Sequence, residues 1–149
     1  MGNDVSAETK IVRFPDGTTV AASPLRAQRA GYEPPDFGLY LDPAWAPTWD
    51  AERIDWPDFG LPADPVKAAA RIVSAFERAQ AGERVEVGCV EGLGRTGTVL
   101  ACMAILAGVR LEKAVGWVRA NYDPRAVETP EQEEWVKWFA RNVRTDRRT

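Results

Sequence analysis

The chain has 149 residues, which fits one domain, and a chain of this length can bury about two thirds of its unfolded surface. Its formal charge of −3, from 19 basic and 22 acidic residues, comes without a basic block, so we expect no nucleic-acid partner. Histidine is absent, which excludes Ser-His and Cys-His nucleophile pairs and every zinc site that needs an imidazole.

The two cysteines, Cys89 and Cys102, are too few for a disulfide framework, so we expect a protein of the reducing cytoplasm. No apolar run reaches the roughly 18 residues of a membrane span, and the N-terminus lacks the apolar core of a signal peptide, so no membrane partner is expected. We expect one domain over residues 1–149, monomeric, with frayed ends at 1–9 and 143–149.

The N-terminal half predicts short strands joined by loops. Two β-prone runs within 10–21 stand on either side of Pro-Asp-Gly, which predicts a hairpin because proline presets φ and glycine accepts a positive φ. Further strands are predicted at 37–41, "FGLYL", and at 52–56, "ERIDW". The remainder of 22–64 is rich in proline and tryptophan, and we expect ordered loops there.

From Pro65 onward the pattern is helical. Apolar residues recur at helical spacing between this proline, suited to a first turn, and a stop at Gly82, which predicts a helix over 65–81. Its apolar positions are Val66, Ala69, Ala70, Ile72, Val73 and Phe76. A short strand, "RVEV" at 84–87, is predicted to follow.

Three more helices are predicted after this strand. The helix over 95–108 is apolar all round, so we expect it to be central and buried. Helices are also predicted over 111–120 and 130–142, and the expected core face of the last one is Trp135, Trp138 and Phe139. Strands followed by helix, strand and three helices indicate an α/β or α+β layer fold.

The stretch "GCVEGLGRTGTV" at 88–99 is dense in glycine and lies between a predicted strand and a predicted helix. Gly92, Gly94 and Gly97 fit the dinucleotide pattern G-x-G-x-x-G, but that fold needs a second parallel strand where this chain predicts another helix. A triphosphate loop also fails, because the stretch has no lysine.

A third interpretation uses more of these residues. Cys89 and Arg95 stand six apart, and Thr96 follows at the start of the buried helix. A strand, a turn that curls backbone amides inward and a helix N-terminus together make an anion nest, to which the arginine adds a bidentate clamp. The same positive field favours the thiolate of the cysteine. The expected phosphate-binding residues are Val90, Glu91, Gly92, Leu93, Gly94 and Arg95. The alternative is a structural tight turn with a buried cysteine.

With these motifs the chain resembles the cysteine-based protein tyrosine and dual-specificity phosphatases. Their signature, C-x5-R followed by Ser or Thr, matches "CVEGLGRT" at 89–96. Their Trp-Pro-Asp loop matches "WPDFGLP" at 56–62, and a Gln-bearing segment after the signature resembles "VETPEQ" at 127–132. The resemblance implies a phosphatase-like fold: one α/β domain with a central mixed, mostly parallel sheet flanked by helices.

The resemblance also implies a role for each motif residue. Cys89 is expected to be the nucleophile that forms a phosphocysteine, Arg95 to bind the transferring phosphoryl group, and Asp58 to protonate the leaving oxygen. Asp58 then takes a proton from water, which Gln132 holds. No metal or other cofactor is needed.

Two secondary roles come from the same resemblance. Thr96 is expected to offer its hydroxyl to the departing thiolate, and Glu128 is a second candidate for holding the water. Each residue has a structural alternative: Asp58 can end a turn, and Gln132 can be an ordinary first-turn helix residue. Arg125 is interpreted as a solvated loop arginine, with a substrate contact at the rim of the site as the alternative. Cys102 is interpreted as a core residue, with a redox partner of Cys89 as the alternative.

The sequence departs from the family pattern at two positions around the nucleophile. Gly88 stands where the family commonly has histidine, and Glu91 brings a carboxylate into the loop. Arg84 and Glu86 are also unusually polar for a central strand. These departures leave open a catalytically weak module that binds phosphoprotein without turnover. We favour a phosphoprotein or phosphopeptide substrate, with phosphotyrosine or dual specificity, over phosphoinositides, because the loop has no lysine.

Overall fold

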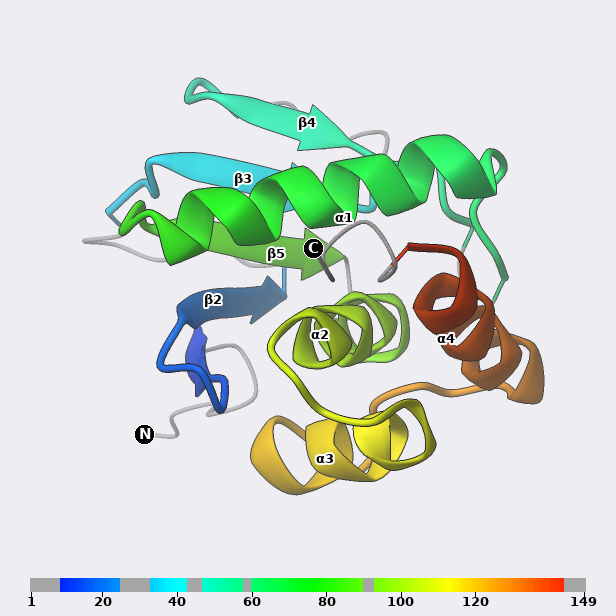
Figure 1. Ribbon diagram of the computed structural model, residues 1–149. Helices are drawn as coiled ribbons and strands as arrows, with labels where there is room; N and C mark the ends of the chain where they lie inside the picture. Colours follow the sequence, from blue (N-terminus) through cyan, green and yellow to red (C-terminus); the bar gives the residue numbers. More distant parts are fainter. Residues whose placement is uncertain (1–8, 25–32, 43–46, 58–59, 90–92, 144–149) are drawn as a thin grey trace, which may run out of the picture.

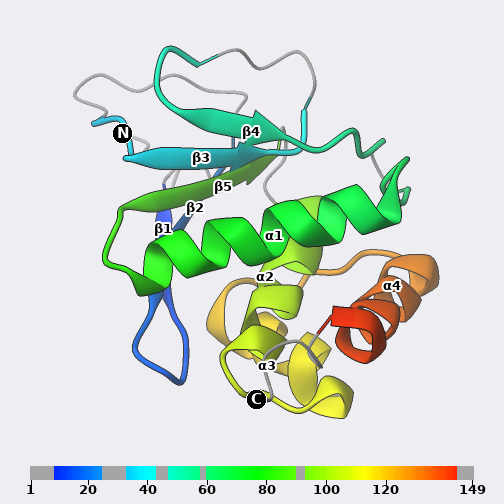
Figure 2. The same cartoon turned by 45° about the horizontal axis from the view of Figure 1, so that its top comes forward.

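The computed structural model describes residues 9–24, 33–42, 47–57, 60–89 and 93–143. Five strands form one sheet in the order β1-β2-β5-β3-β4 (Figures 1 and 2). Only β1 and β2 pair antiparallel, and the pairs β2–β5, β5–β3 and β3–β4 are parallel. The strands are β1 (Lys10–Arg13), β2 (Thr19–Pro24), β3 (Phe37–Tyr40), β4 (Ala51–Arg53) and β5 (Val85–Cys89). The expected mixed, mostly parallel sheet is confirmed.

The β1–β2 hairpin turns at the predicted Pro-Asp-Gly sequence. Gly17 has a φ of 89°, a conformation that glycine adopts without steric cost. Its N–H donates to the Phe14 carbonyl at 2.8 Å, and the Asp16 carboxylate accepts from the Thr18 N–H at 3.0 Å. Next to β1, Thr9 shares a hydrogen bond of 2.8 Å with Ser23 of β2.

Strand β5 lies in the centre of the sheet, and every one of its residues is buried. The polar residue that looked out of place there, Glu86, is only 3% exposed. Its carboxylate accepts a hydrogen bond of 2.6 Å from Ser23 of β2 and one of 2.5 Å from Tyr40 of β3. A buried charge is tolerated when it is hydrogen-bonded in this way, so both neighbouring strands are tied to the strand that ends in Cys89.

The helices gather on one side of this sheet (Figures 1 and 2). They are α1 (Pro65–Gln80), α2 (Gly94–Leu106), α3 (Ala114–Asn121) and α4 (Pro130–Val143), with a 3-10 turn at Leu111–Lys113. Helix α2 contacts β5 and each of the other three helices. All of its residues from Gly94 to Ile105 are buried, as predicted from its uniform apolarity.

Helix α1 buries a stripe that differs from the predicted one. Asp64 caps the helix through the Lys67 N–H at 3.1 Å, and Pro65 occupies the first turn. The buried residues are Ala68, Ala69, Ile72, Ala75, Phe76 and Ala79. Val66, by contrast, is 70% exposed. Small alanines allow the helix to approach the sheet closely, so part of the apolar pattern faces away from the core.

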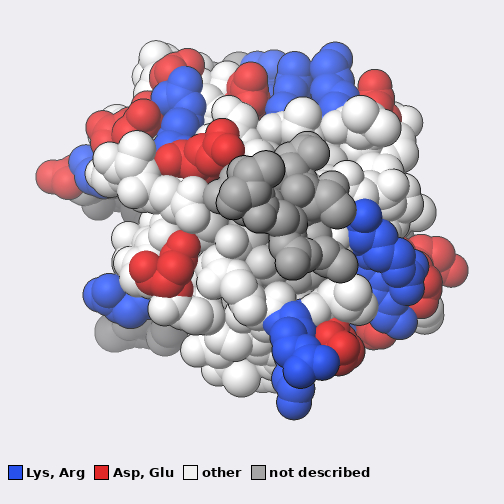
Figure 3. All heavy atoms as spheres, viewed as in Figure 1, with Lys and Arg blue, Asp and Glu red and all other residues white. Residues whose placement is uncertain are grey.

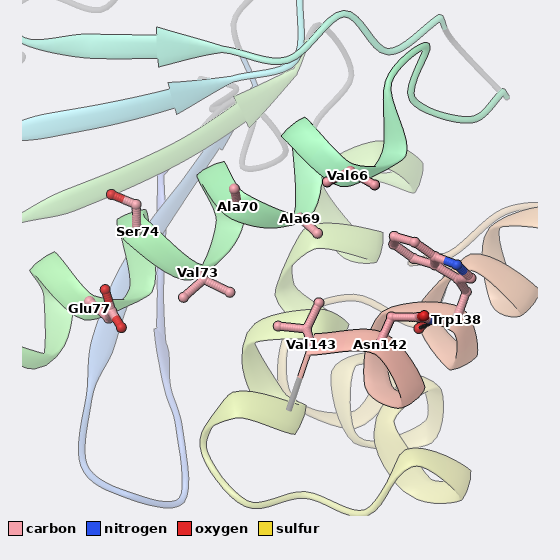
Figure 4. Close-up of a pocket in the computed structure, with 9 residues that line it drawn as sticks. All are labelled: Val66, Ala69, Ala70, Val73, Ser74, Glu77, Trp138, Asn142 and Val143. Carbon is pink, nitrogen blue, oxygen red and sulfur yellow. Dashed lines mark hydrogen bonds between the residues drawn. The ribbon is translucent and has the colours of Figure 1, made fainter. Parts of the chain in front are cut away.

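The apolar positions outside the core of α1 line a groove against α4. The groove has a volume of about 560 Å3 (Figure 4). From α4 it receives Trp138, which was predicted to be in the core but is only partly buried, whereas Trp135 and Phe139 are in the core as expected. Its lining residues are Val66, Ala69, Ala70, Val73, Ser74, Glu77, Trp138, Asn142 and Val143. None of them belongs to the three motifs.

Candidate active site

Cys89 lies at the carboxyl end of β5, between the ends of two parallel neighbours, and is 1% exposed. The Oγ1 hydroxyl of Thr96, in the first turn of α2, donates to its Sγ over 3.0 Å. This contact places the Cys89 thiol beside the start of a buried helix, whose N-terminal dipole favours a negative charge. Val90, Glu91 and Gly92 of the predicted phosphate-binding loop lie outside the described residues, and Leu93 and Gly94 begin α2.

Arg95 is buried, with 5% of its surface exposed. Its Nη1 donates to the Leu41 carbonyl at 3.1 Å and to the Trp56 carbonyl at 2.9 Å. The first carbonyl follows β3 and the second directly precedes the Pro57 of the Trp-Pro-Asp motif. One guanidinium therefore joins the phosphate-loop end of α2 to two other segments, among them the segment expected to carry the general acid.

The Trp-Pro-Asp segment is held at both of its described ends. Trp56 is fully buried, packs edge-on against Trp135 of α4 with centroids 5.3 Å apart, and donates from Nε1 to the Gly60 carbonyl at 2.8 Å. The Gly60 N–H in turn donates to the Pro57 carbonyl at 2.9 Å. The expected acid, Asp58, lies outside the described residues.

Gln132 lies in the first turn of α4 and is fully buried. Its Oε1 accepts from the Glu128 N–H at 2.9 Å, and its Nε2 donates to the Gly60 carbonyl at 3.2 Å. The side chain thus connects the Trp-Pro-Asp segment to the residues that precede α4. Sequence reasoning had no signal for this link, because the two ends are 72 residues apart.

The segment Ala126–Glu128 packs against the start of α2 through glycines. A Cβ on Gly97 would lie 2.5 Å from the Ala126 Cβ and 2.9 Å from its Cα, and a Cβ on Gly94 would collide with the Glu128 side chain. Gly94 and Gly97 are therefore small because another part of the chain crosses them closely. Of the two candidates for holding water, Glu128 is the exposed one.

The chain between α3 and this segment carries a cluster of charges beside Tyr122. Burial and the charges of Cys89 and Asp123 raise the pKa of Tyr122. Burial opposes ionisation of Asp123, but bonds from the Arg125 side chain and N–H outweigh it, so the pKa of Asp123 is lowered. Lys10 adds an ion pair of 3.6 Å. Arg125 is an exposed residue paired with this carboxylate, in keeping with its interpretation as a surface arginine.

The second cysteine, Cys102, is fully buried within α2, and burial raises the pKa of its thiol.

The described residues contain no group of three or more His, Cys, Asp or Glu side chains placed to hold a metal ion. No helix among them is long and apolar enough to cross a membrane. On the face shown in Figure 3, charged side chains of both signs lie around the rim of the described surface.

A mostly parallel sheet whose central strand ends in Cys89, followed by a helix that carries Arg95, defines an α/β protein of the type that the motifs predict. The model of the protein-tyrosine phosphatase family matches residues 48–129, more than half of the chain, and the chain belongs to this family. The match spans the Trp-Pro-Asp segment, the Cys-x5-Arg signature and the chain up to Thr129. At the family level the chain is therefore a cysteine-based phosphatase.

Relatives and solved structures agree with this membership. Two uncharacterized proteins of Methanocaldococcus jannaschii are 40% and 38% identical to the chain over 110 residues; each match covers 66% of this chain and 71% or 66% of the relative. Tk-PTP, solved in its active form, is 27% identical with a TM-score of 0.71, over 89% of this chain and 97% of that one. Kinase associated phosphatase has a TM-score of 0.74 at 11% identity, over 95% and 98%, and that likeness shows the fold alone.

Proposed function

We propose that this protein hydrolyses phosphate monoesters of phosphoproteins through a phosphocysteine on Cys89. The observation that carries the proposal is the contact of 3.0 Å between the Thr96 hydroxyl and Sγ, with the buried Arg95 as the preceding residue of the same helical turn. A hydroxyl donor stabilises a thiolate, and a guanidinium offers paired donors to a phosphoryl group. Neither role requires an imidazole.

In the first step the Cys89 thiolate attacks phosphorus, and an S–P bond forms as the bond from phosphorus to the leaving oxygen breaks. Asp58 gives its proton to that oxygen, so the product is a neutral alcohol or phenol. The amides of residues 90–95 and the Arg95 guanidinium stabilise charge on the three equatorial oxygens. Covalent capture divides one slow displacement into two faster ones.

In the second step water attacks phosphorus and gives a proton to Asp58, now a carboxylate. The S–P bond breaks, and the sulfur leaves as a thiolate, which accepts a hydrogen bond from the Thr96 hydroxyl. We assign Gln132 and Glu128 different roles in this step. The Gln132 amide bonds the Glu128 N–H and the Gly60 carbonyl, and so supports the segment that precedes α4. The exposed Glu128 carboxylate packs beside Gly94 and orients the water.

The proposed substrate class is a phosphotyrosine-bearing or dual-specificity phosphoprotein. Glu91 in the loop opposes polyanionic substrates by charge repulsion, which disfavours inositol phosphates. Glu91→Lys should therefore shift the ratio of rates toward a polyphosphorylated substrate, and an unchanged ratio would remove this argument for phosphoprotein.

The decisive experiment separates turnover from binding alone. Wild-type protein and Cys89→Ser are assayed with an aryl phosphate, and the wild type should show a burst of one phenolate per active site that the variant lacks. Binding without any burst in the wild type would mean that the chain is a phosphate-binding module.

Thiol reactivity provides the independent check. Cys89 should be alkylated by iodoacetate at pH 6 faster than a free thiol, and inorganic phosphate or vanadate should protect it. Cys102→Ala is the matched control, because Cys102 is fully buried and its removal should leave the alkylation unchanged. Slow alkylation without protection would contradict the proposal.

A further inference from the structure

The guanidinium of Arg119, near the end of α3, donates hydrogen bonds to the backbone that precedes α4. Its Nε donates to the Ala126 carbonyl at 2.9 Å and its Nη2 to the Val127 carbonyl at 2.7 Å. Nη2 also lies 3.5 Å from the Glu133 carboxylate. Two donors on one edge of the planar group thus hold two consecutive carbonyls, a geometry that an ammonium group cannot reproduce.

Val127 needs such support because its backbone is strained. Its φ is 63°, in the left-handed region, and it is the one residue other than glycine with a positive φ among those that the structure describes. A β-branched side chain in this region costs on the order of 1–3 kcal/mol and persists only where the surroundings over-determine it. Val127 is 2% exposed, so its side chain is fixed in the core while Arg119 fixes its carbonyl.

The strained residue lies between two contacts with the start of α2. On one side Ala126 packs onto Gly97, and on the other the Glu128 side chain packs onto Gly94. The left-handed turn at Val127 directs the chain from the first contact to the second. It also presents the Glu128 N–H to Gln132 at 2.9 Å.

We propose that Arg119 is a positioning residue for the second chemical step: by holding the Ala126 and Val127 carbonyls it sets the Glu128 carboxylate beside the phosphate loop. This proposal rests on the proposed function, since it concerns hydrolysis of the phosphocysteine. It adds a residue outside the three sequence motifs, on helix α3. Arg119 acts through Glu128 and does not touch the reacting atoms.

The kinetic test uses Arg119→Met, which keeps an unbranched stem, although a shorter one, and removes the donors. With a nitrophenyl phosphate substrate, kcat should fall by about tenfold to a hundredfold because the water is misplaced. The ratio kcat/KM should stay within about threefold of the wild-type value, because it includes steps only up to loss of the leaving group. The KM falls accordingly, and the burst amplitude stays near one per active site. Equal losses in kcat and kcat/KM would overturn the proposal.

Two further variants separate positioning from general damage. Glu133→Gln removes the ion pair of Arg119 but leaves both carbonyl bonds, and its kcat should match the wild type. Val127→Gly relieves the strain, because glycine adopts a positive φ without cost. In the Val127→Gly protein, Arg119→Met should therefore reduce kcat by a factor several-fold smaller than the factor by which it reduces kcat in the wild type. Both rates are expressed per active site. An undiminished loss would contradict the role assigned to Val127.

Amide hydrogen exchange gives a readout that does not depend on turnover. In Arg119→Met the Glu128 N–H should exchange at least tenfold faster, while amides in the middle of α2 keep their wild-type protection. Unchanged exchange at Glu128 would overturn the proposal even if kcat fell. If the wild type formed no phosphocysteine, the proposed function would fail and the role in hydrolysis with it, while the exchange measurement would still decide whether Arg119 holds the segment.

Discussion

The two halves of the candidate site are built on different principles. Cys89 and Thr96 belong to the central strand and to a helix that is buried on all sides, so their positions follow from the core. The segment Ala126–Gln132 comprises a stretch outside any helix or strand and the first residues of α4. It is held by the Arg119 side chain at two carbonyls, by close packing on Gly94 and Gly97, and by the bond from Gln132 to the Gly60 carbonyl.

This difference indicates which substitutions should impair each chemical step. In the proposed mechanism, formation of the phosphocysteine depends on groups fixed by the sheet and α2, together with the expected acid segment, which is tied to Arg95 through the Trp56 carbonyl. Hydrolysis would depend in addition on the segment before α4, whose geometry includes a strained residue. Substitutions in the first half should therefore affect both steps, and substitutions in the second half should affect mainly the second.

Asp58→Asn should have the largest effect of the changes outside the signature. A phenol or alkoxide with a high pKa cannot leave unprotonated, so phosphorylation of Cys89 should slow by roughly 10² to 10⁴ for phosphopeptides. For a nitrophenyl phosphate the loss should be much smaller. The measurement is a leaving-group series by pre-steady-state bursts, and equal losses across it would show that Asp58 positions its loop and donates no proton.

Thr96→Ala should lower kcat by about tenfold to a hundredfold, the value of a hydrogen bond to a charged group. Both steps involve the thiolate, so alkylation of Cys89 at pH 6 should slow as well. Thr96→Ser, which keeps the hydroxyl, is the control and should retain most of both rates. Wild-type alkylation in Thr96→Ala would mean that the bond of 3.0 Å to Sγ has no role in activating the nucleophile.

A pair of glycine substitutions tests the contact between the two halves. Gly97→Ala places a Cβ 2.5 Å from Ala126 and 2.9 Å from its backbone, which must shift, so the free energy of unfolding should fall by about 1–3 kcal/mol. Gly94→Ala meets only the exposed Glu128 side chain, which can swing away. It should keep its stability and lose kcat, as measured by urea unfolding and steady-state assays. The reverse pattern would contradict the packing described for this contact.

The first half of the site could be predicted from the sequence because its chemistry requires neighbouring residues. A cysteine, an arginine six residues later and an all-apolar helix are legible in one stretch, and so are the hairpin turn and the boundaries of α1. The strain at Val127 and the bonds of Arg119 to carbonyls seven and eight residues along the chain could not be predicted, because no sequence pattern specifies such a backbone conformation. The Gln132 link could not be predicted because its two ends are 72 residues apart. The same reason explains Glu86, whose polar character made sense only once Ser23 and Tyr40 were beside it.

The smallest expected effect concerns the charge of Asp123, which lies between α3 and the segment that precedes α4. The pKa of Asp123 is lowered in the folded protein, so its carboxylate contributes stability above its unfolded pKa of about 3.9 and loses it as the pH falls through the folded pKa. Asp123→Asn keeps an oxygen that accepts from the Arg125 N–H, removes the charge, and puts an NH2 group in place of the second oxygen, which accepts from Arg125 Nη2 at 3.3 Å. It should lower the free energy of unfolding at pH 7 by less than about 1 kcal/mol.

The pH dependence of this difference is the sharper measurement. Because wild-type Asp123 becomes neutral in acid, the difference in unfolding free energy between the two proteins should shrink as the pH falls through the folded pKa of Asp123. Lys10→Met provides a second comparison: it removes the ion pair of 3.6 Å and the bond of 3.3 Å to the Tyr122 carbonyl while the Arg125 bonds remain, so it should show a smaller difference at pH 7. A difference between wild type and Asp123→Asn that did not change as the solution was acidified would assign the effect to hydrogen-bond geometry. The conformation of the chain around Asp123 would then depend on steric fit alone, as the packing of Ala126–Glu128 on Gly94 and Gly97 does.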